Sequence, residues 1–136
     1  NDCITQTAVS TVANQSGVIG VMAGECNSDF VPASLGYYVE GLMGCKNEFV
    51  LKPEFADIYE TYRPLAVNAI GEGKINVCGQ GGDIAIGDLI VASDTAGKGM
   101  KQADDIVRSY TVAKSRETVT FTGSEIKQIA CIYLGG

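Results

Sequence analysis

Turn-forming residues recur about every ten positions along this chain and separate short runs rich in β-branched residues. The chain has 17 glycines among 136 residues but only 3 prolines, so glycine supplies most of the turn signals. Glycine adopts the positive φ angles that tight turns need, and β-branched side chains fit a pleated, half-buried surface. The pattern predicts an all-β fold, a small barrel or sandwich of short strands with Gly-rich turns.

The expected strands are clearest in the second half of the chain. We predict them at 65–70, 74–78, 84–91, 107–114 and 118–122, with turns at 71–73, 79–83, 87–88 and 93–99 and a short strand after the last turn. Residues 125–134 fit a final strand with Ile129, Cys131 and Tyr133 on one face. The spacing of Ile126, Ile129 and Ile132 also fits a short helix, but we favour the strand.

The first half has a weaker pattern. Residues 3–12 and 18–23 read as two strands joined by a turn at 14–17, which predicts a hairpin. Residues 55–62 fit a helix or a strand, and we favour a strand. We therefore expect an N-terminal part at 1–62, with the hairpin and an aromatic-rich segment, and a β-module at 63–136, packed as one compact unit.

The charge of the chain argues against nucleic acid and membranes as partners. The formal net charge is -6, and the Lys and Arg residues are scattered. Such a surface repels phosphate groups. No apolar run reaches the roughly 18 residues of a membrane-spanning helix.

The five cysteines indicate free thiols. Their number is odd, their spacing is wide and no C-x-x-C pair occurs. The chain has no histidine either, so a structural zinc site is not expected. We predict buried or half-buried free thiols in a protein assembled in a reducing cytoplasm, and no metal or other cofactor. Because the chain begins at Asn1, we expect a fragment of a longer protein or a processed product.

The residues that could carry catalysis also have structural explanations. Without histidine the usual general base at neutral pH is missing. A Ser–Lys pair remains, built from Ser93 or Ser115 with Lys98 or Lys114, but a turn serine and a solvated lysine explain these residues better. We therefore expect no enzyme activity.

Acidic and glycine-rich segments suggest a second kind of site. Carboxylates that could act as an acid–base pair or bind calcium occur at Asp83, Asp88, Asp94, Asp104 and Asp105. They lack the calcium-loop pattern, and aspartate beside a turn glycine or serine normally accepts a hydrogen bond from its own turn. The stretches 79–82 and 97–99 match no phosphate-binding motif, so strand connection is the expected role.

Aromatic residues cluster in the first half of the chain. They are Phe30, Tyr37, Tyr38, Phe49, Phe55, Tyr59 and Tyr62. Aromatic residues at this density form either a subunit interface or the core of the N-terminal half. We keep both interpretations and name these seven residues as a candidate interface.

Residues Arg63–Leu134 resemble a β-module near the C-termini of phage tail fibres and related virion appendage proteins. The similar pieces are 63–67, 73–77, 86–94, 97–101, 112–117, where Ala113 replaces the usual glycine, and 129–134. Residues 9–12 and 17–21 are similar to the hairpin that precedes that module.

The resemblance implies a structural virion protein: a tail fibre, appendage or capsid-surface module, assembled in the host cytoplasm. Its expected partners are further copies of itself, as a homotrimer, and other virion proteins. Some relatives are fibre chaperone domains that cut themselves off, but no catalytic motif of theirs matches here. Two alternatives therefore stay open: an autoproteolytic intramolecular chaperone domain of a trimeric fibre, and a β-domain that binds carbohydrate or another small ligand through residues such as Tyr37 and Tyr38.

Overall fold

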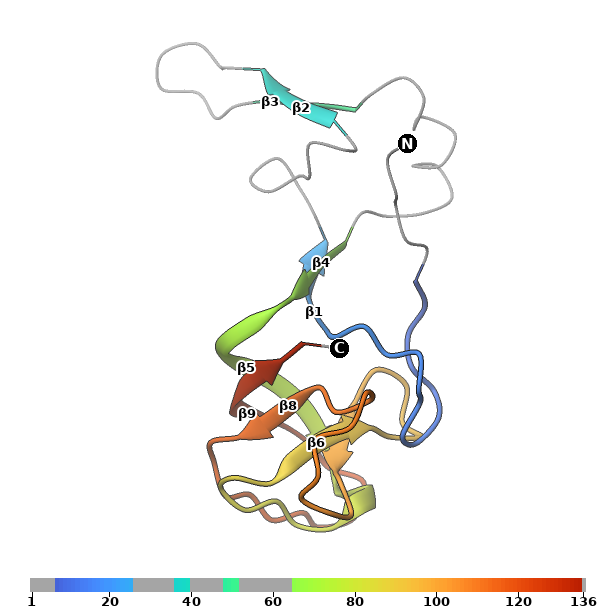
Figure 1. The fold of residues 1–136 in the computed structure, drawn as a ribbon, viewed down its shortest axis with the longest axis vertical. Coiled ribbons are helices and arrows are strands. Elements are labelled where there is room, and N and C mark those ends of the chain that lie inside the picture. The colour runs from blue at the N-terminus through green and yellow to red at the C-terminus, as the bar shows by residue number, and fades with distance from the viewer. Residues whose placement is uncertain (1–6, 26–35, 40–47, 52–64, 136) are drawn as a thin grey trace. The chain divides into compact units, whose positions relative to one another are not determined.

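The computed structural model describes residues 7–25, 36–39, 48–51 and 65–135. These residues contain nine β-strands and one short 3-10 helix but no α-helix (Figure 1). Five of the strands close into a barrel. The prediction of an all-β fold with a small barrel of short strands is confirmed. No helix in this part of the chain has the length and apolar character needed to cross a membrane.

The chain divides into two compact units, one of residues 1–6 and 22–66, the other of residues 7–21 and 67–136. In the first unit β2 (Gly36–Val39) pairs antiparallel with β3 (Glu48–Leu51). A separate two-stranded sheet joins β1 (Val21–Glu25) to β4 (Leu65–Asn68).

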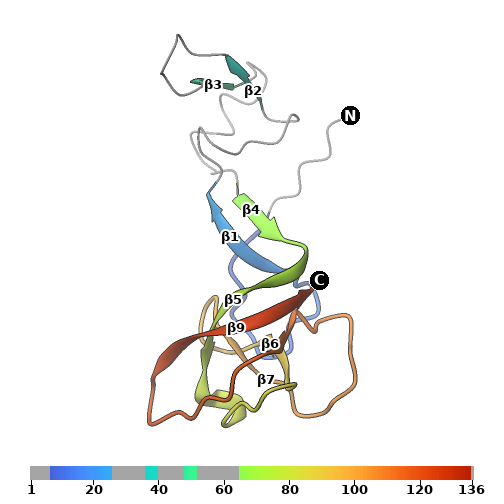
Figure 2. The same cartoon turned by 90° about the vertical axis from the view of Figure 1, so that its left-hand side faces the viewer.

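The barrel lies in the second unit and is drawn from a second direction in Figure 2. Its strands are β5 (Ile70–Cys78), β6 (Leu89–Ala92), β7 (Gly99–Lys101), β8 (Ala113–Ser115) and β9 (Ile126–Leu134). They close in the order β5-β7-β6-β8-β9. Only β5 and β7 run parallel, whereas β5 and β9 pair antiparallel over their full length.

The barrel interior holds the main hydrophobic cluster. It consists of Ile75, Val77, Ile84, Ile90, Val112, Ala113, Ile129, Cys131 and Tyr133. On β9 the buried residues alternate, because Ile129, Cys131 and Tyr133 point inward while their neighbours are half-buried or exposed. This confirms the strand and its face and excludes the short helix.

A second hydrophobic cluster, the outer cluster, covers one side of the barrel. It is formed by Cys78, Val91 and Met100, with Ala13 and Tyr110 packed against it. Val91 pairs with Met100 across β6 and β7. Because side chains alternate along a strand and Ile90 belongs to the interior cluster, Val91 must point out of the barrel.

Residues 7–21, here called the N-terminal strap, run over the barrel without forming a strand before Val21. The predicted hairpin of 3–12 with 18–23 is therefore wrong over its described residues; residues 3–6 lie outside them. The reason is tertiary, because backbone groups of the strap bond to the barrel instead of to each other. Gly97 N donates to Ser10 O at 2.9 Å, and Asn14 N donates to Ala92 O at 3.0 Å.

Other predicted boundaries shift for similar reasons. The turn expected at 71–73 lies inside β5, and the strand expected at 107–114 is reduced to β8. Residues 118–122 contribute only a single bridge, between Val119 and Ile84. The turn at 87–88 and the short strand after the turn at 93–99, which is β7, are confirmed. Cys78 and Cys131 are buried free thiols, as predicted, while the other three cysteines lie outside the described residues.

Candidate functional site

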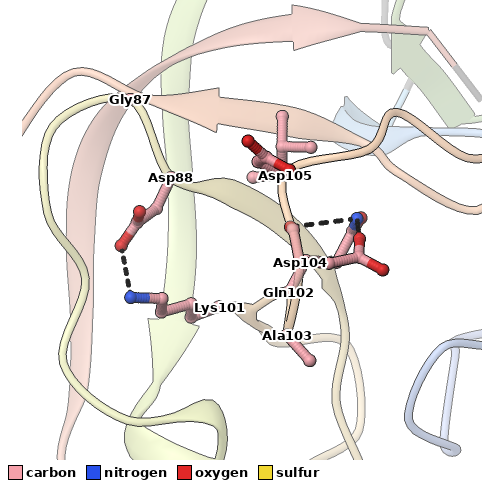
Figure 3. A pocket seen from close by; sticks show the side chains of 8 residues that line it. Gly87, Asp88, Lys101, Gln102, Ala103, Asp104 and Asp105 are labelled. Atoms are coloured by element: carbon pink, nitrogen blue, oxygen red, sulfur yellow. Dashed lines mark hydrogen bonds and ion pairs between the residues drawn. The ribbon is translucent and has the colours of Figure 1, made fainter.

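An open pocket lies beside the Gly87–Asp88 turn, where the β7–β8 connection begins (Figure 3). Its volume is about 330 Å³, and it is lined by Gly87, Asp88, Leu89, Lys101, Gln102, Ala103, Asp104 and Asp105. The pocket brings together three of the five aspartates singled out from the sequence. They come from segments on either side of β6 and β7, so only the fold makes them neighbours.

Asp88 forms the charged centre of this pocket together with Lys101. Their side chains face each other in Figure 3, with Asp88 Oδ2 3.0 Å from Lys101 Nζ. The same oxygen accepts a hydrogen bond from Ala85 N at 2.8 Å. Burial alone would raise the pKa of Asp88, but the Ala85 N–H and the Lys101 ammonium together lower this pKa below its usual 3.8. Asp88 is therefore a carboxylate at neutral pH.

The far wall of the pocket is organised by Gln102, which is only 4% exposed. Its Nε2 donates to Asp104 Oδ1 at 2.7 Å and to Ile106 O at 2.6 Å. Its Oε1 accepts from Thr111 Oγ1 at 2.6 Å, and that hydroxyl in turn accepts from Arg108 N. One buried amide thus forms hydrogen bonds to three residues of the connection between β7 and β8, namely Asp104, Ile106 and Thr111.

Asp104 closes the same network by an ion pair with Arg108, whose Nη2 lies 2.5 Å from Asp104 Oδ2. The hydrogen bonds from Arg108 and Gln102 lower the pKa of Asp104 to about 2. Asp88 and Asp104 are both ionised at neutral pH and so cannot donate a proton there. No group of three metal-ligating side chains occurs within the described ranges. Both carboxylates are paired with cations of the same chain, Asp88 with Lys101 and Asp104 with Arg108.

Asp83 and Asp94 lie elsewhere and join segments far apart in sequence. Asp83 Oδ1 accepts from Phe121 N at 3.0 Å. Asp94 accepts from Ala13 N at 2.9 Å and from Gln80 Nε2 at 2.7 Å. The expected role in local turns is confirmed for Asp88 and for Asp104, which also accepts from Ile106 N. Asp83 and Asp94 serve tertiary contacts instead.

The hydroxyl groups of the two candidate serine nucleophiles form hydrogen bonds within local turns. The Ser93 hydroxyl is buried, donates to Lys98 O at 2.8 Å and accepts from Thr95 N at 3.2 Å. The Ser115 hydroxyl donates to Glu117 O at 2.7 Å and accepts from Glu117 N. Each hydroxyl bonds to backbone groups at most five residues away, as expected of turn serines.

The glycine-rich stretches connect strands at close range. A Cβ on Gly79 would lie 2.7 Å from Phe121 Cβ, and one on Gly81 would collide with Lys101 O. Gly97 has a φ of +68°, in the region that favours glycine. Strand connection accounts for these glycines.

The aromatic candidate interface is mostly outside the described residues. Phe30, Phe55, Tyr59 and Tyr62 lie there entirely. For the other three the structure gives only the backbone register, in which Tyr38 pairs with Phe49 and Tyr37 with Val50. Their assignment as an interface stays a prediction.

Sequence reasoning missed a set of exposed apolar side chains on the barrel unit. Within residues 67–136 the most exposed are Ile70 at 81%, Ile86 at 69%, Val107 at 64% and Ile106 at 57%. Ile86 precedes the pocket turn, and Ile106 follows the pocket residue Asp105. β-branched residues at these positions read as strand interior, so periodicity alone hid their exposure.

Comparison of the chain with protein-family models, with curated proteins and with solved structures found no match.

Proposed function

We propose that this chain is a structural module of a bacteriophage virion, part of a tail fibre, an appendage or a capsid-surface protein. Its role is assembly, through association with further copies of itself as a homotrimer and with other virion proteins. The starting point is the resemblance of residues 63–134 to a fibre and appendage module. Our proposal includes no catalytic role, because the described candidate groups are used in folding.

One observation supports the proposal most directly. The β7–β8 connection is held by the buried amide of Gln102, yet it presents Ile106 and Val107 to solvent. An isolated domain gains no stability from a loop that is held in place while two of its β-branched side chains stay exposed. Contiguous exposed apolar patches that are rimmed by polar residues mark interaction sites when they are large, and Ile106 and Val107 would form the centre of such a patch. Here the rim is the Asp104–Arg108 ion pair.

Charge is also compatible with self-association of the barrel unit. Residues 67–136 contain eight Asp and Glu against seven Lys and Arg, whereas residues 1–66 contain eight against three. Copies that meet through the barrel unit therefore face little net repulsion, unlike copies that meet through the acidic first half.

The test begins with the mass of the protein in solution by light scattering. We expect three times the chain mass of 14.3 kDa. The double substitution of Ile106 and Val107 by Ser should reduce association, whereas Ile126→Ser on β9 is the matched control. Mass spectrometry of purified particles should detect the chain in multiple copies.

A monomer that is absent from purified particles would overturn the proposal. Two further results would each favour one of the alternative functions. Spontaneous cleavage of a longer chain at the bond before Asn1 would favour the autoprocessing chaperone. Specific binding on a glycan array that depends on Tyr37 and Tyr38 would favour a carbohydrate-binding domain.

A further inference from the structure

We propose that the N-terminal strap, residues 7–21, is a removable cover: it leaves the barrel while the barrel stays folded, and so uncovers the outer cluster. This inference concerns the second unit alone and does not depend on the assembly role. Figure 1 shows the strap in blue along one side of the barrel.

The barrel does not need the strap to close. Its five strands form a complete ring, and the strap adds no strand to it. Its interior is filled from the strands and their connections, while the strap adds only the partly buried Val18 and Val21 at the margin. Removing the strap therefore breaks no strand pairing within the ring, and the cooperative core stays together.

The strap itself buries little apolar surface. Val9 is 63% exposed, Val12 is 55% exposed and Ile19 is 49% exposed. Because local stability follows the apolar area that a segment buries, such a segment opens at a lower free energy than the barrel. The structure accordingly combines a stable ring with a weakly held covering segment.

A few hydrogen bonds hold the strap, and one of them depends on a side chain of the barrel. Ser10 O and Asn14 N bond to backbone groups of Gly97 and Ala92. Between them, Ala13 N donates to the Asp94 carboxylate. Asp94 is fixed by Gln80, which bonds both its carboxylate and its backbone N–H. Asp94 thus acts as the latch that sets the strap on the outer cluster.

Two thiols distinguish opening of the strap from unfolding of the barrel. Cys78 is 5% exposed and lies in the outer cluster, against which Ala13 of the strap packs. Cys131 is fully buried in the barrel interior. Opening of the strap should expose Cys78 alone, whereas global unfolding exposes both.

The experiment is pulsed alkylation of the whole protein with N-ethylmaleimide under native conditions, read at each cysteine by peptide mass spectrometry. Asp94→Ala should raise the labelling rate of Cys78 about 3- to 10-fold, as expected for the loss of one hydrogen bond of ordinary net strength at an exposed position. The rate at Cys131 should stay unchanged. Comparing each thiol with itself removes differences in intrinsic reactivity.

The matched control is Asp83→Ala. Asp83 also accepts a backbone N–H from a distant segment, but its partner is Phe121 and not the strap. This variant should leave the rate at Cys78 unchanged relative to Cys131. Equal acceleration of both thiols by Asp94→Ala would show that strap and barrel open together and would overturn the proposal. An unchanged Cys78 labelling rate would exclude Asp94 as the latch and would also overturn the proposal.

Discussion

The Tyr133 hydroxyl on β9 bonds both backbone polar groups of Lys74 on β5. It accepts a hydrogen bond from Lys74 N at 2.9 Å and donates one to Lys74 O. β7 has only three residues and pairs with β5 at a single position, Val77 with Gly99. A side chain from the barrel interior therefore satisfies backbone groups that a longer neighbouring strand would otherwise bond.

The first prediction concerns this hydroxyl. Tyr133→Phe removes both bonds and leaves the part-buried N–H and C=O of Lys74 without this partner. We expect a loss of about 1–3 kcal/mol in the free energy of unfolding, measured by urea denaturation. The control is Tyr110→Phe, in a tyrosine that packs on the outer cluster. This variant should lose less free energy of unfolding than Tyr133→Phe. Equal losses in the two variants would refute a special role for the Tyr133 hydroxyl.

The second prediction concerns Gly73, which lies under the Tyr133 ring. A Cβ at Gly73 would collide with that ring, while one at Gly17 would meet nothing within 4 Å. Gly73→Ala should therefore destabilise the protein by about 1–3 kcal/mol through overpacking. Gly17→Ala should stay within about 0.5 kcal/mol of the parent. Melting curves of the two variants test the contrast, and similar midpoints would contradict it.

The third prediction concerns Gln102. Replacing this buried amide by Ala leaves Thr111 Oγ1 and Ile106 O without their partner. We expect a loss of about 1–3 kcal/mol and faster cleavage of residues 103–111 by proteases. Gln128→Ala, an exposed position on β9, should change neither quantity. A Gln102→Ala protein with parental protease resistance would show that other contacts order the connection.

The fourth prediction concerns acid. Arg108 and Gln102 hold the pKa of Asp104 at about 2, below its ordinary 3.8. A carboxyl whose folded pKa is depressed stabilises the protein above its unfolded pKa, and this contribution disappears as the pH falls through the folded value. Ordering of the β7–β8 connection should therefore weaken between pH 3.8 and about 2.

Asp104→Asn should remove this part of the acid transition and leave a flatter stability profile over the same pH range. Amide chemical shifts of Ile106 and Arg108 would report it, because the Ile106 N–H and the Arg108 side chain bond to Asp104. A parental profile in the variant would assign the transition to another carboxyl.

Local patterns account for what could be predicted. Turn chemistry identified the Gly87–Asp88 turn and the turn before β7, because the residues that form a turn are adjacent in sequence. Alternation identified the inward face of β9. Turn chemistry also predicted a turn at 71–73, and this prediction is wrong. Gly71 and Gly73 lie within β5, and the Tyr133 ring packs against Gly73.

By itself the sequence determined the all-β class, the local turn roles of Ser93, Ser115 and Asp88, and the face of β9. The tertiary structure alone decided where the strap lies, which connection carries the pocket, and what Asp94 and Tyr133 bond. The physical reason is separation along the chain. Tyr133 and Lys74 are 59 residues apart, and Asp94 and Ala13 are 81 apart. No local propensity encodes such a partner, because the closed barrel brings the two groups together.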